Sequence, residues 1–231
     1  MNIRNTLFFC FTFCYIAAWS QSTENAGWLS LSHTQKLSKK FDLLSNLQIR
    51  SADKFKYLNT LQVRAGLGYN LDDAHSVGAG YLYENNKSWE DGKTMITHEN
   101  RIYEQYQFET DVKRTQFTFR FRQEQRFIRD TGSYKFSQRS RASVSARIPL
   151  AVNADFSKGL YATLQNEIFL NTQHKERDNN SIFDQNRAYV SIGYRWSKKI
   201  DTEIGYMNWR QRETDGDFST NVCQMIISTS F

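Results

Sequence analysis

The sequence predicts an all-β chain that closes into a transmembrane antiparallel up-and-down β-barrel of ten to twelve strands. Three observations lead to this fold: apolar and polar residues alternate along most of the chain, the alternating segments are long, and short and long connections follow one another. The composition agrees, because 15% aromatic residues and a single Pro are untypical of disordered chains. After the first twenty residues, no apolar run reaches the ~18 residues that a spanning helix needs.

Residues 1–20 have the features of a secretory signal peptide. Arg4 precedes an apolar stretch from Leu7 to Ala18, and the small residues Ala18 and Ser20 fit cleavage near Ser20. The alternative is a short buried helix. We expect the chain to be exported, with a location in the outer membrane.

Cleavage near Ser20 changes the cysteine count. It would remove Cys10 and Cys14 and leave Cys223 alone, so no internal disulfide is expected. The domain organisation that follows is a signal peptide, a short N-terminal linker over residues 21–26 and a barrel over residues 27–231.

The alternation is clearest from Thr115 to Phe127. One face of this segment carries Phe117, Phe119 and Phe121, and the other carries Thr118, Arg120, Arg122, Glu124 and Arg126. Such a period of two is the pattern of a strand, and it fits no amphipathic helix. Turning the segment over would place Arg120 and Arg122 in hydrocarbon, at about 2 to 4 kcal/mol each near the midplane.

Eleven segments follow this pattern or continue it. They lie near residues 27–37, 42–50, 56–71, 76–86, 99–110, 115–127, 136–148, 159–171, 183–196, 200–212 and 221–231. Single-chain bacterial barrels normally have an even number of strands. We therefore expect either ten spanning strands, with the first segment not spanning, or twelve, with one strand not recognised.

A soluble sandwich or lipocalin-like barrel would show the same alternation with the apolar face turned inward. The lengths of the segments and of the connections between them favour the membrane barrel, since segments of about ten to fourteen residues can cross a bilayer at a tilt of about 45°. The short connections are residues 72–74, 111–114 and 197–199, and the longer ones are 85–95, 129–135, 171–182 and 213–220. Short periplasmic turns and long external loops are typical of such barrels.

Several motifs of the chain are similar to one known family. They are NEIFLN at residues 166–171, FDQNR at 183–187, GYRWSKKIDTEIGYM at 193–207, RFRQEQRF at 120–127 and KKF at 39–41. Over most of the chain the sequence resembles an outer-membrane-barrel family of Gram-negative envelope proteins known only as a domain of unknown function. Members often carry Asn-His in the last strand, where this chain has Asn221-Val222. The resemblance implies the fold and the location and brings no activity.

The two strand faces give two sets of candidate residues. The predicted lumen charge network consists of Arg64, Glu84, Arg101, Arg120, Arg122, Glu124, Arg126, Arg139, Arg141, Arg147, Glu167, Arg187, Arg195 and Glu203. The predicted lipid-facing set consists of Phe117, Phe119, Phe121, Val144, Val190, Ile192, Tyr194, Ile204, Ile227 and Phe231. Arg187 and Glu167, on neighbouring strands, are a plausible ion pair. Inward glycines, among them Gly66, Gly80 and Gly193, are interpreted as space for bulky neighbours.

An excess of inward Arg indicates small-solute passage or binding that favours anions. The alternative is a non-conducting structural or surface-interaction barrel, whose interior charges pair to offset desolvation. A lipid-modifying enzyme is the third class, with His98, Glu99 and Ser88 as its one candidate cluster. No metal or cofactor motif is present, and we expect none. Trp196 and Trp209 are expected to anchor the barrel at opposite membrane interfaces.

The expected partners follow from the location. They are outer-membrane lipids and lipopolysaccharide, a small solute, and the barrel assembly machinery, which would read the C-terminal aromatic Phe231 on the lipid face. A nucleic-acid partner is not expected, although the net charge is +6, because the chain is exported.

Overall fold

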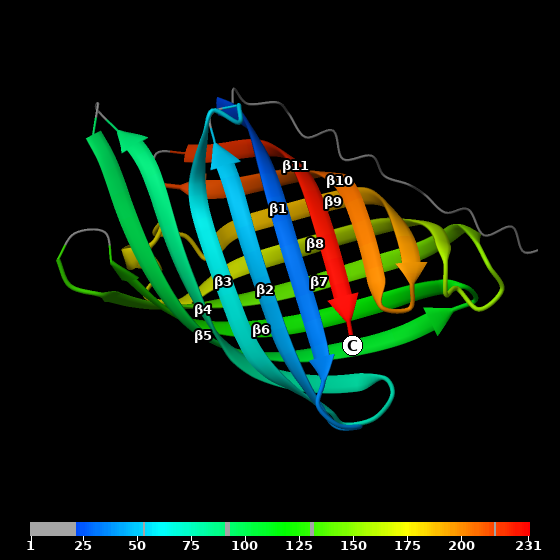
Figure 1. Cartoon of the computed structure of the whole chain (residues 1–231). Coiled ribbons are helices and arrows are strands. Elements are labelled where there is room, and N and C mark those ends of the chain that lie inside the picture. The colour runs from blue at the N-terminus through cyan, green and yellow to red at the C-terminus, as the bar shows by residue number, and fades with distance from the viewer. Residues whose placement is uncertain (1–21, 53, 91–92, 130–131, 215) are drawn as a thin grey trace, which may run out of the picture.

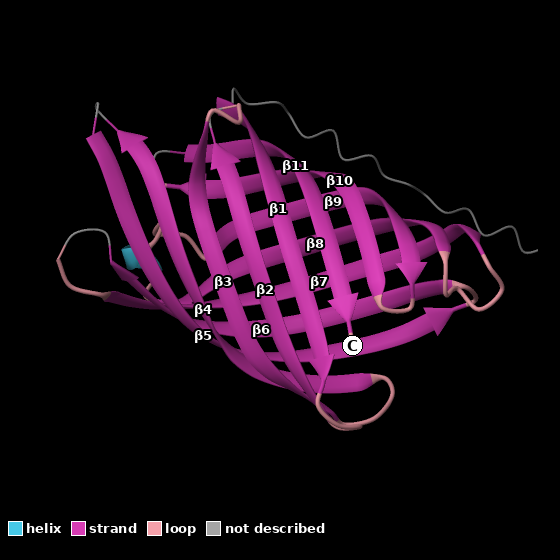
Figure 2. Ribbon diagram, in the orientation of Figure 1, coloured by secondary structure: helices cyan, strands magenta, loops and turns pink. Residues whose placement is uncertain are grey.

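The computed structural model describes residues 22–231 except 53, 91–92, 130–131 and 215, and β-strands dominate it (Figures 1 and 2). The strands are β1 (Ser22–Lys36), β2 (Phe41–Ala52), β3 (Tyr57–Asn70), β4 (His75–Glu90), β5 (Lys93–Val112), β6 (Thr115–Arg129), β7 (Lys135–Val152), β8 (Gly159–Gln173), β9 (Phe183–Ser197), β10 (Ile200–Glu213) and β11 (Gly216–Ser230). A single turn of 3-10 helix, Lys175–Arg177, follows β8. No helix in this part of the chain is long and apolar enough to span a membrane. The predicted signal peptide, residues 1–20, lies outside the described residues.

The strands form one closed barrel in which each strand pairs with its neighbours along the chain. Ten of the strand pairs are antiparallel, and β1 and β11 close the ring as a parallel pair, with Leu29 beside Met225. Figure 1 shows these two strands side by side and pointing the same way. With eleven alternating strands, the first and the last must run in the same direction. The count lies within the predicted range, but the expectation of an even number was wrong.

Each segment expected from the sequence coincides with one strand, although the segments 27–37, 56–71 and 221–231 extend one residue beyond their strands, and several strands are longer than expected. β4 and β5 pair as far as Glu90 and Lys93, so the loop expected over residues 85–95 shrinks to residues 91–92. The loop expected over 213–220 shrinks in the same way to residues 214–215. β1 already begins at Ser22, within the segment expected to be a linker.

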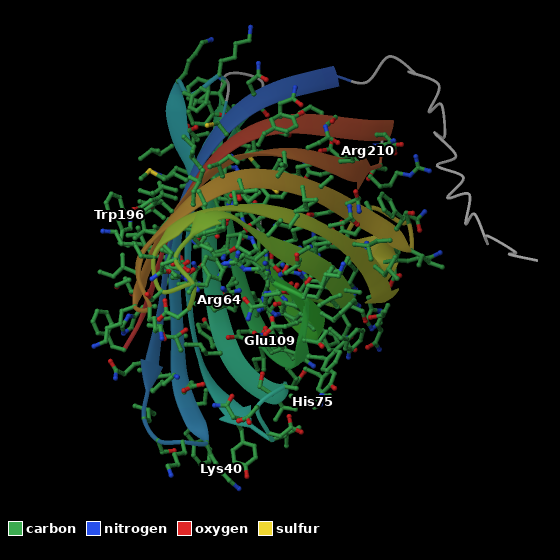
Figure 3. All side chains as sticks on the ribbon, turned by 90° about the vertical axis from the view of Figure 1, so that its right-hand side faces the viewer. Lys40, Arg64, His75, Glu109, Trp196 and Arg210 are labelled. Atoms are coloured by element: carbon green, nitrogen blue, oxygen red, sulfur yellow. The ribbon has the colours of Figure 1, made fainter. Side chains whose placement is uncertain are left out.

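The connections lie at two ends of the barrel, which we call the turn end and the loop end. The turn end carries residues 37–40, 71–74, 113–114, 153–158 and 198–199, and the loop end carries 53–56, 91–92, 130–134, 174–182 and 214–215. The segment 174–182 is the longest of them. The two ends therefore differ in the expected sense but less than the sequence suggested. In Figure 3, Lys40 and His75 mark the turn end, and Arg210 lies toward the loop end.

The barrel is polar inside and apolar outside. Among the described residues, 25 polar or charged side chains are buried, against 10 hydrophobic ones. Of the side chains expected to face lipid, Phe119, Phe121, Val144, Val190, Ile192, Ile204 and Phe231 are exposed, whereas Phe117, Tyr194 and Ile227 are partly buried. Figure 3 shows Arg64 within the barrel and Trp196 outside it. This distribution is the reverse of a water-soluble core.

Inward glycines make room for aromatic rings in the lumen. A Cβ atom at Gly66 or Gly80 would lie 2.5 Å from the hydroxyl oxygen of Tyr103, and one at Gly193 would lie 2.5 Å from Cε2 of Tyr161. Tyr103 and Tyr161 are both fully or nearly fully buried. The interpretation of these glycines as space for bulky neighbours is confirmed.

Candidate functional site

The centre of the lumen is held by carboxylates that each accept hydrogen bonds from two arginines. Glu124 of β6 is 1% exposed, and it accepts hydrogen bonds from Arg139 Nη2 at 2.8 Å and Arg141 Nη1 at 2.7 Å. Both arginines stand on β7, where the register places Arg139 opposite Glu124. A buried ion offsets its desolvation only with such pairing, so this geometry stabilises the wall.

The same arrangement continues on both sides of Glu124. Glu167 of β8 accepts hydrogen bonds from Arg141 Nη2 and Arg120 Nη2, each at 2.9 Å. Glu99 of β5 accepts a hydrogen bond from Arg126 Nε at 2.6 Å and one from Arg101 Nη2 at 2.8 Å. We call Glu99, Glu124 and Glu167 with their arginine partners the paired wall.

Two acidic residues extend the paired wall toward the loop end, and the sequence did not reveal them. Asp184 Oδ2 accepts a hydrogen bond from Arg139 Nη1 at 2.8 Å, and Asp178 pairs with Arg126. Asp184 has the parity of the outer face of β9, but a register shift between Phe169 and Leu170 breaks the alternation there. Asp178 lies in the connection between β8 and β9, where the alternation of strand faces does not predict the direction of a side chain.

A smaller network stands at the turn end. Arg195 donates hydrogen bonds to Asp201 at 2.8 and 2.9 Å, and Arg147 lies 3.5 Å from Glu203. Glu203 also accepts hydrogen bonds from the hydroxyls of Ser191, at 2.7 Å, and Tyr161, at 3.1 Å. The charges in this part of the lumen are therefore balanced.

All fourteen side chains predicted for the charge network lie on the inner face, and eleven of them form ion pairs. The other three are Arg64, Arg122 and Arg187, which have no ion pair within the described part of the chain. Arg122 donates a hydrogen bond to Gln105 at 2.6 Å and stacks on Tyr103, 4.5 Å from the ring centroid. These three arginines supply the positive excess of the lumen.

Arg187 shows how an arginine of the lumen comes to have no carboxylate partner among the described residues. The register places it opposite Glu167, as the sequence suggested, but that carboxylate is already held by Arg141 and Arg120. Its guanidinium lies instead 4.6 Å from the centroid of Phe169 and 5.0 Å from that of Trp209. Nη2 donates a hydrogen bond to Gln185 at 3.0 Å, while the buried Nε has no hydrogen-bond partner in the part of the chain that the structure describes.

The aromatic residues around Arg187 come from β1, β8 and β10. Trp28 and Trp209 meet edge to face, with centroids 5.1 Å apart, and Arg50 of β2 lies 4.2 Å over Trp28. We call Trp28, Phe169 and Trp209 with Arg50 and Arg187 the aromatic wall. The expectation that Trp209 anchors the barrel at a membrane interface was wrong, because its side chain points into the lumen.

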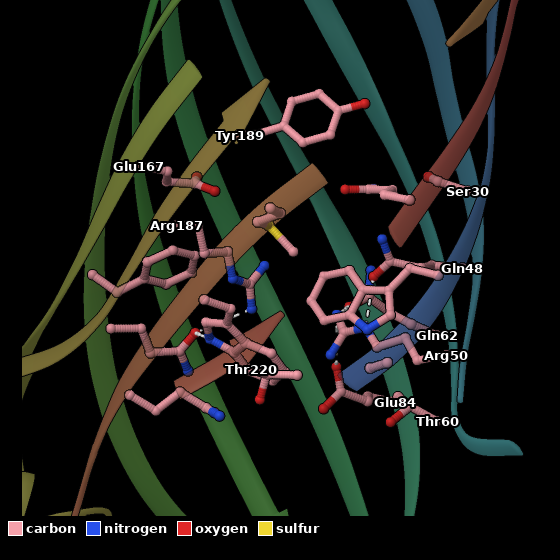
Figure 4. Close-up of a pocket in the computed structure, with 18 of the residues that line it drawn as sticks. Ser30, Gln48, Arg50, Thr60, Gln62, Glu84, Glu167, Arg187, Tyr189 and Thr220 are labelled. Carbon is pink, nitrogen blue, oxygen red and sulfur yellow. Dashed lines mark hydrogen bonds and ion pairs between the residues drawn. The ribbon is translucent and has the colours of Figure 1, made fainter. Parts of the chain in front are cut away.

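A cavity of about 640 Å³ opens beside the aromatic wall (Figure 4). In this view Arg50, Gln48, Gln62 and Glu84 stand on one side and Arg187 and Glu167 on the other. Residues from the loop end, including Glu213, also line it, so it belongs to the loop-end half of the lumen. We call it the loop-end cavity.

A second cavity, of about 700 Å³, lies at the turn end and is lined by residues such as Lys40, Asp72 and Glu109. No residue lines both cavities. Along β5, Arg101 lines the first cavity and Gln105 the second, and Tyr103 between them is 2% exposed. Tyr103 therefore fills part of the lumen between the two cavities.

The cluster considered for catalysis does not form. His98 bonds to Tyr83 at 2.9 Å, whereas Glu99, the next residue along β5, points inward to Arg101 and Arg126. Successive residues of a strand point to opposite faces, so the His98 ring and the Glu99 carboxylate cannot act together. No group of three metal-binding side chains is present among the described residues.

Comparison with known proteins identified a family. The model of a family described as "Protein of unknown function (DUF2490)" matches residues 25–220, which is more than half of the chain. No curated protein matched the chain, and no solved structure matched it.

Proposed function

Because this chain belongs to the DUF2490 family of proteins of unknown function, we propose its function from the barrel itself: it is an outer-membrane β-barrel that binds small anionic solutes in its lumen. The site is the loop-end cavity, and the lumen does not conduct ions freely. The observation that carries the proposal is Arg187, a charged side chain on a cavity with a buried donor that no group of the described residues satisfies.

The outer surface supports insertion into a membrane. Phe121 of β6 is 51% exposed, and Val190 and Ile192 of β9 are exposed as well. A water-soluble monomer seldom exposes such contiguous apolar surface. Near the turn end, outward aromatic pairs such as Tyr194 and Trp196 resemble an interfacial belt. The shorter connections at the turn end support an orientation with the turn end in the periplasm and the loop end outside.

Brominated phospholipids test the insertion, because bromine quenches tryptophan fluorescence on contact. A variant that keeps only Trp196, which is 57% exposed, should be quenched in such vesicles. A variant that keeps only Trp28, which is 4% exposed in the lumen, should be quenched far less. Equal quenching of the two would contradict a barrel with a lipid-facing exterior.

The charges support a preference for anions. Arg64, Arg122 and Arg187 have no carboxylate partner within the described residues, and low-dielectric walls strengthen their field. Binding rather than passage is favoured because the two cavities share no lining residue. A barrel that sits in a planar bilayer should therefore show no steady ion current, and a steady ohmic current from folded protein would overturn the sealed lumen.

Calorimetric titration of the folded barrel in detergent tests the binding. Acetate, inorganic phosphate, glucuronate and glucose 6-phosphate are the anionic probes, at constant ionic strength in chloride, with a tetraalkylammonium salt as the cationic one. At least one carboxylate or phosphate probe should bind, and the cation should not. If none of the anions binds, the alternative of a structural barrel replaces this proposal.

A further inference from the structure

The aromatic wall fixes two guanidinium groups without using their hydrogen-bond donors. A guanidinium stacked on a ring uses its flat face, so its N–H groups point sideways in the plane of the group. Arg187 is held in this way between Phe169 and the two tryptophans, with centroid distances of 4.6 to 5.2 Å. The rings therefore act as a rigid support, and the edge of Arg187 remains available to an oxyanion.

Arg50 plays a different part from Arg187. Its Nε donates a hydrogen bond to Gln48 Oε1 at 2.8 Å, its Nη2 donates one to Gln62 Oε1 at 3.1 Å, and Glu84 lies 3.9 Å away. Arg50 is thus largely satisfied by the protein. It orients the two glutamines, so that their oxygens face Arg50 and their amide NH2 groups are left for another partner.

The rest of the loop-end cavity is rich in amides. Gln48, Gln62, Gln165 and Gln224 line it, and the last two make no side-chain hydrogen bond to the described part of the chain. Asn59 lines it as well, and its buried Oδ1 accepts no hydrogen bond from the described residues. Each amide offers both a donor and an acceptor.

This mixture of groups restricts the ligand. A bare carboxylate only accepts hydrogen bonds, and inorganic phosphate carries few O–H donors at neutral pH. Either anion would satisfy Arg187 and leave most of the amide oxygens of Asn59, Gln165 and Gln224 without donors. Hydroxyl groups both donate and accept hydrogen bonds, as amides do. Several hydroxyls carried on one small ring-shaped ligand could therefore bond to the amide side chains of the cavity. The faces of Trp28 are taken by Arg50 and Arg187, and the ring is 4% exposed, so no flat slot remains there for an aromatic ligand.

We propose that the loop-end cavity binds a hydroxylated oxyanion of the sugar-acid or sugar-phosphate class. The oxyanion sits on the edge of Arg187, and the hydroxyls bond to Gln48, Gln62, Gln165 and Gln224. A volume of about 640 Å³ is within the range of pockets for small ligands. This inference rests on the proposed anion binding and adds the chemical class of the anion.

The test compares each sugar anion with its simple counterpart in calorimetric titrations of the folded full-length barrel. Glucuronate should bind at least ten-fold more tightly than acetate, or glucose 6-phosphate at least ten-fold more tightly than inorganic phosphate. The pair that shows the gain identifies the oxyanion as carboxylate or phosphate. Neutral glucose should not bind at the same concentrations, because it cannot pair with Arg187.

Two variants separate the roles of charge and amides. Arg187→Gln should weaken the binding of the sugar anion at least ten-fold. The double variant Gln165→Leu, Gln224→Leu keeps the charge of Arg187. It should reduce the affinity for the sugar anion to a value near the affinity for acetate or inorganic phosphate. The matched control is Arg212→Gln, which removes an arginine that is 47% exposed and pairs with Asp217 at the loop end, and it should leave binding unchanged. Heat-dependent gel mobility confirms folding of every variant.

The outcomes distinguish this inference from the function on which it rests. If acetate and phosphate bind as tightly as their sugar counterparts, the sugar class is wrong and anion binding stands. If glucose binds as tightly as glucuronate, the oxyanion contact with Arg187 is wrong. If none of the anions binds, both proposals fail.

Discussion

The paired wall and the aromatic wall use the hydrogen-bond donors of arginine in different ways within one lumen. In the paired wall, Arg139 and Arg141 lie over the ring of Phe169, at 5.1 and 4.3 Å from its centroid, and direct their donors at carboxylates, sharing Glu124 at 2.7 to 3.0 Å. In the aromatic wall, the guanidinium of Arg187 lies on rings and keeps a donor without a partner. The comparison teaches that the partners of a buried charge, more than its type, indicate whether it supports structure or is available to a ligand.

The largest difference in stability is expected from a substitution at Glu124 in the paired wall. Glu124→Gln leaves Arg139 and Arg141 without their shared counter-charge, and removal of one partner of a buried pair costs about 3–5 kcal/mol. We expect the free energy of unfolding to fall by that amount in urea titrations of the barrel in detergent.

The same substitution on the outer face is the control. Glu104 is an exposed neighbour on β5 that accepts one hydrogen bond from Gln125 at 3.1 Å. Glu104→Gln should change the free energy of unfolding by less than about 1 kcal/mol. If the two variants lose the same stability, the paired wall does not support the fold.

A smaller effect on stability is expected at Arg187. Because Arg187 has no ion pair among the described residues, Arg187→Gln removes a desolvated charge and strands no carboxylate. The free energy of unfolding should stay within about 1 kcal/mol of the original protein in the same urea titrations. A loss as large as that of Glu124→Gln would place Arg187 with the paired wall and end the distinction.

The smallest effect on stability is expected from an ion pair that is exposed to water. This pair serves as the reference for the buried arginines of both walls. In the turn between β7 and β8, hydrogen bonds from Ser157 and from Lys198, whose Nζ lies 3.2 Å away, lower the pKa of Asp155 from 3.8 to about 2. Since the folded pKa is depressed, the contribution of this carboxylate is complete above about pH 4 and is lost as the pH falls toward 2.

An NMR titration of the Asp155 carboxyl carbon in the micelle-bound barrel measures this shift. Lys198→Gln should move the pKa of Asp155 part of the way back toward 3.8 and leave the unfolding transition at neutral pH nearly unchanged, because an exposed pair contributes little. A titration of Asp155 at its ordinary value in the unaltered protein would contradict these hydrogen bonds.

The alternation of side chains was enough to predict the barrel and the inner position of its arginines. Parity assigns each residue to a face, and the strand from Thr115 follows it without a break. Parity says nothing about partners, however, because an inward side chain can reach either neighbouring strand or the strand beyond it, as Arg120 of β6 reaches Glu167 of β8. Glu167 therefore bonds to Arg141 and Arg120 rather than to Arg187, which faces it directly.

Other features were missed for equally specific reasons. Trp209 was expected at an interface from its position near the end of a strand, although it shares the inward parity of Glu203 and Gly205, and in the structure its ring packs against Trp28 in the lumen. Asp184 was missed because a register shift reverses its face. The parallel closure was missed because the even strand number of other barrels was taken as a rule.

The meeting of β1 with β11 also sets the order in which the molecule can be completed. Every other strand pair joins consecutive strands, whereas His33 and Thr229, which bond across this contact at 2.8 Å, are 196 positions apart. The entropy of bringing distant segments together is thus concentrated in one contact. The sheet can grow hairpin by hairpin, and the ring then closes in a single late step that needs the first and the last strand at once.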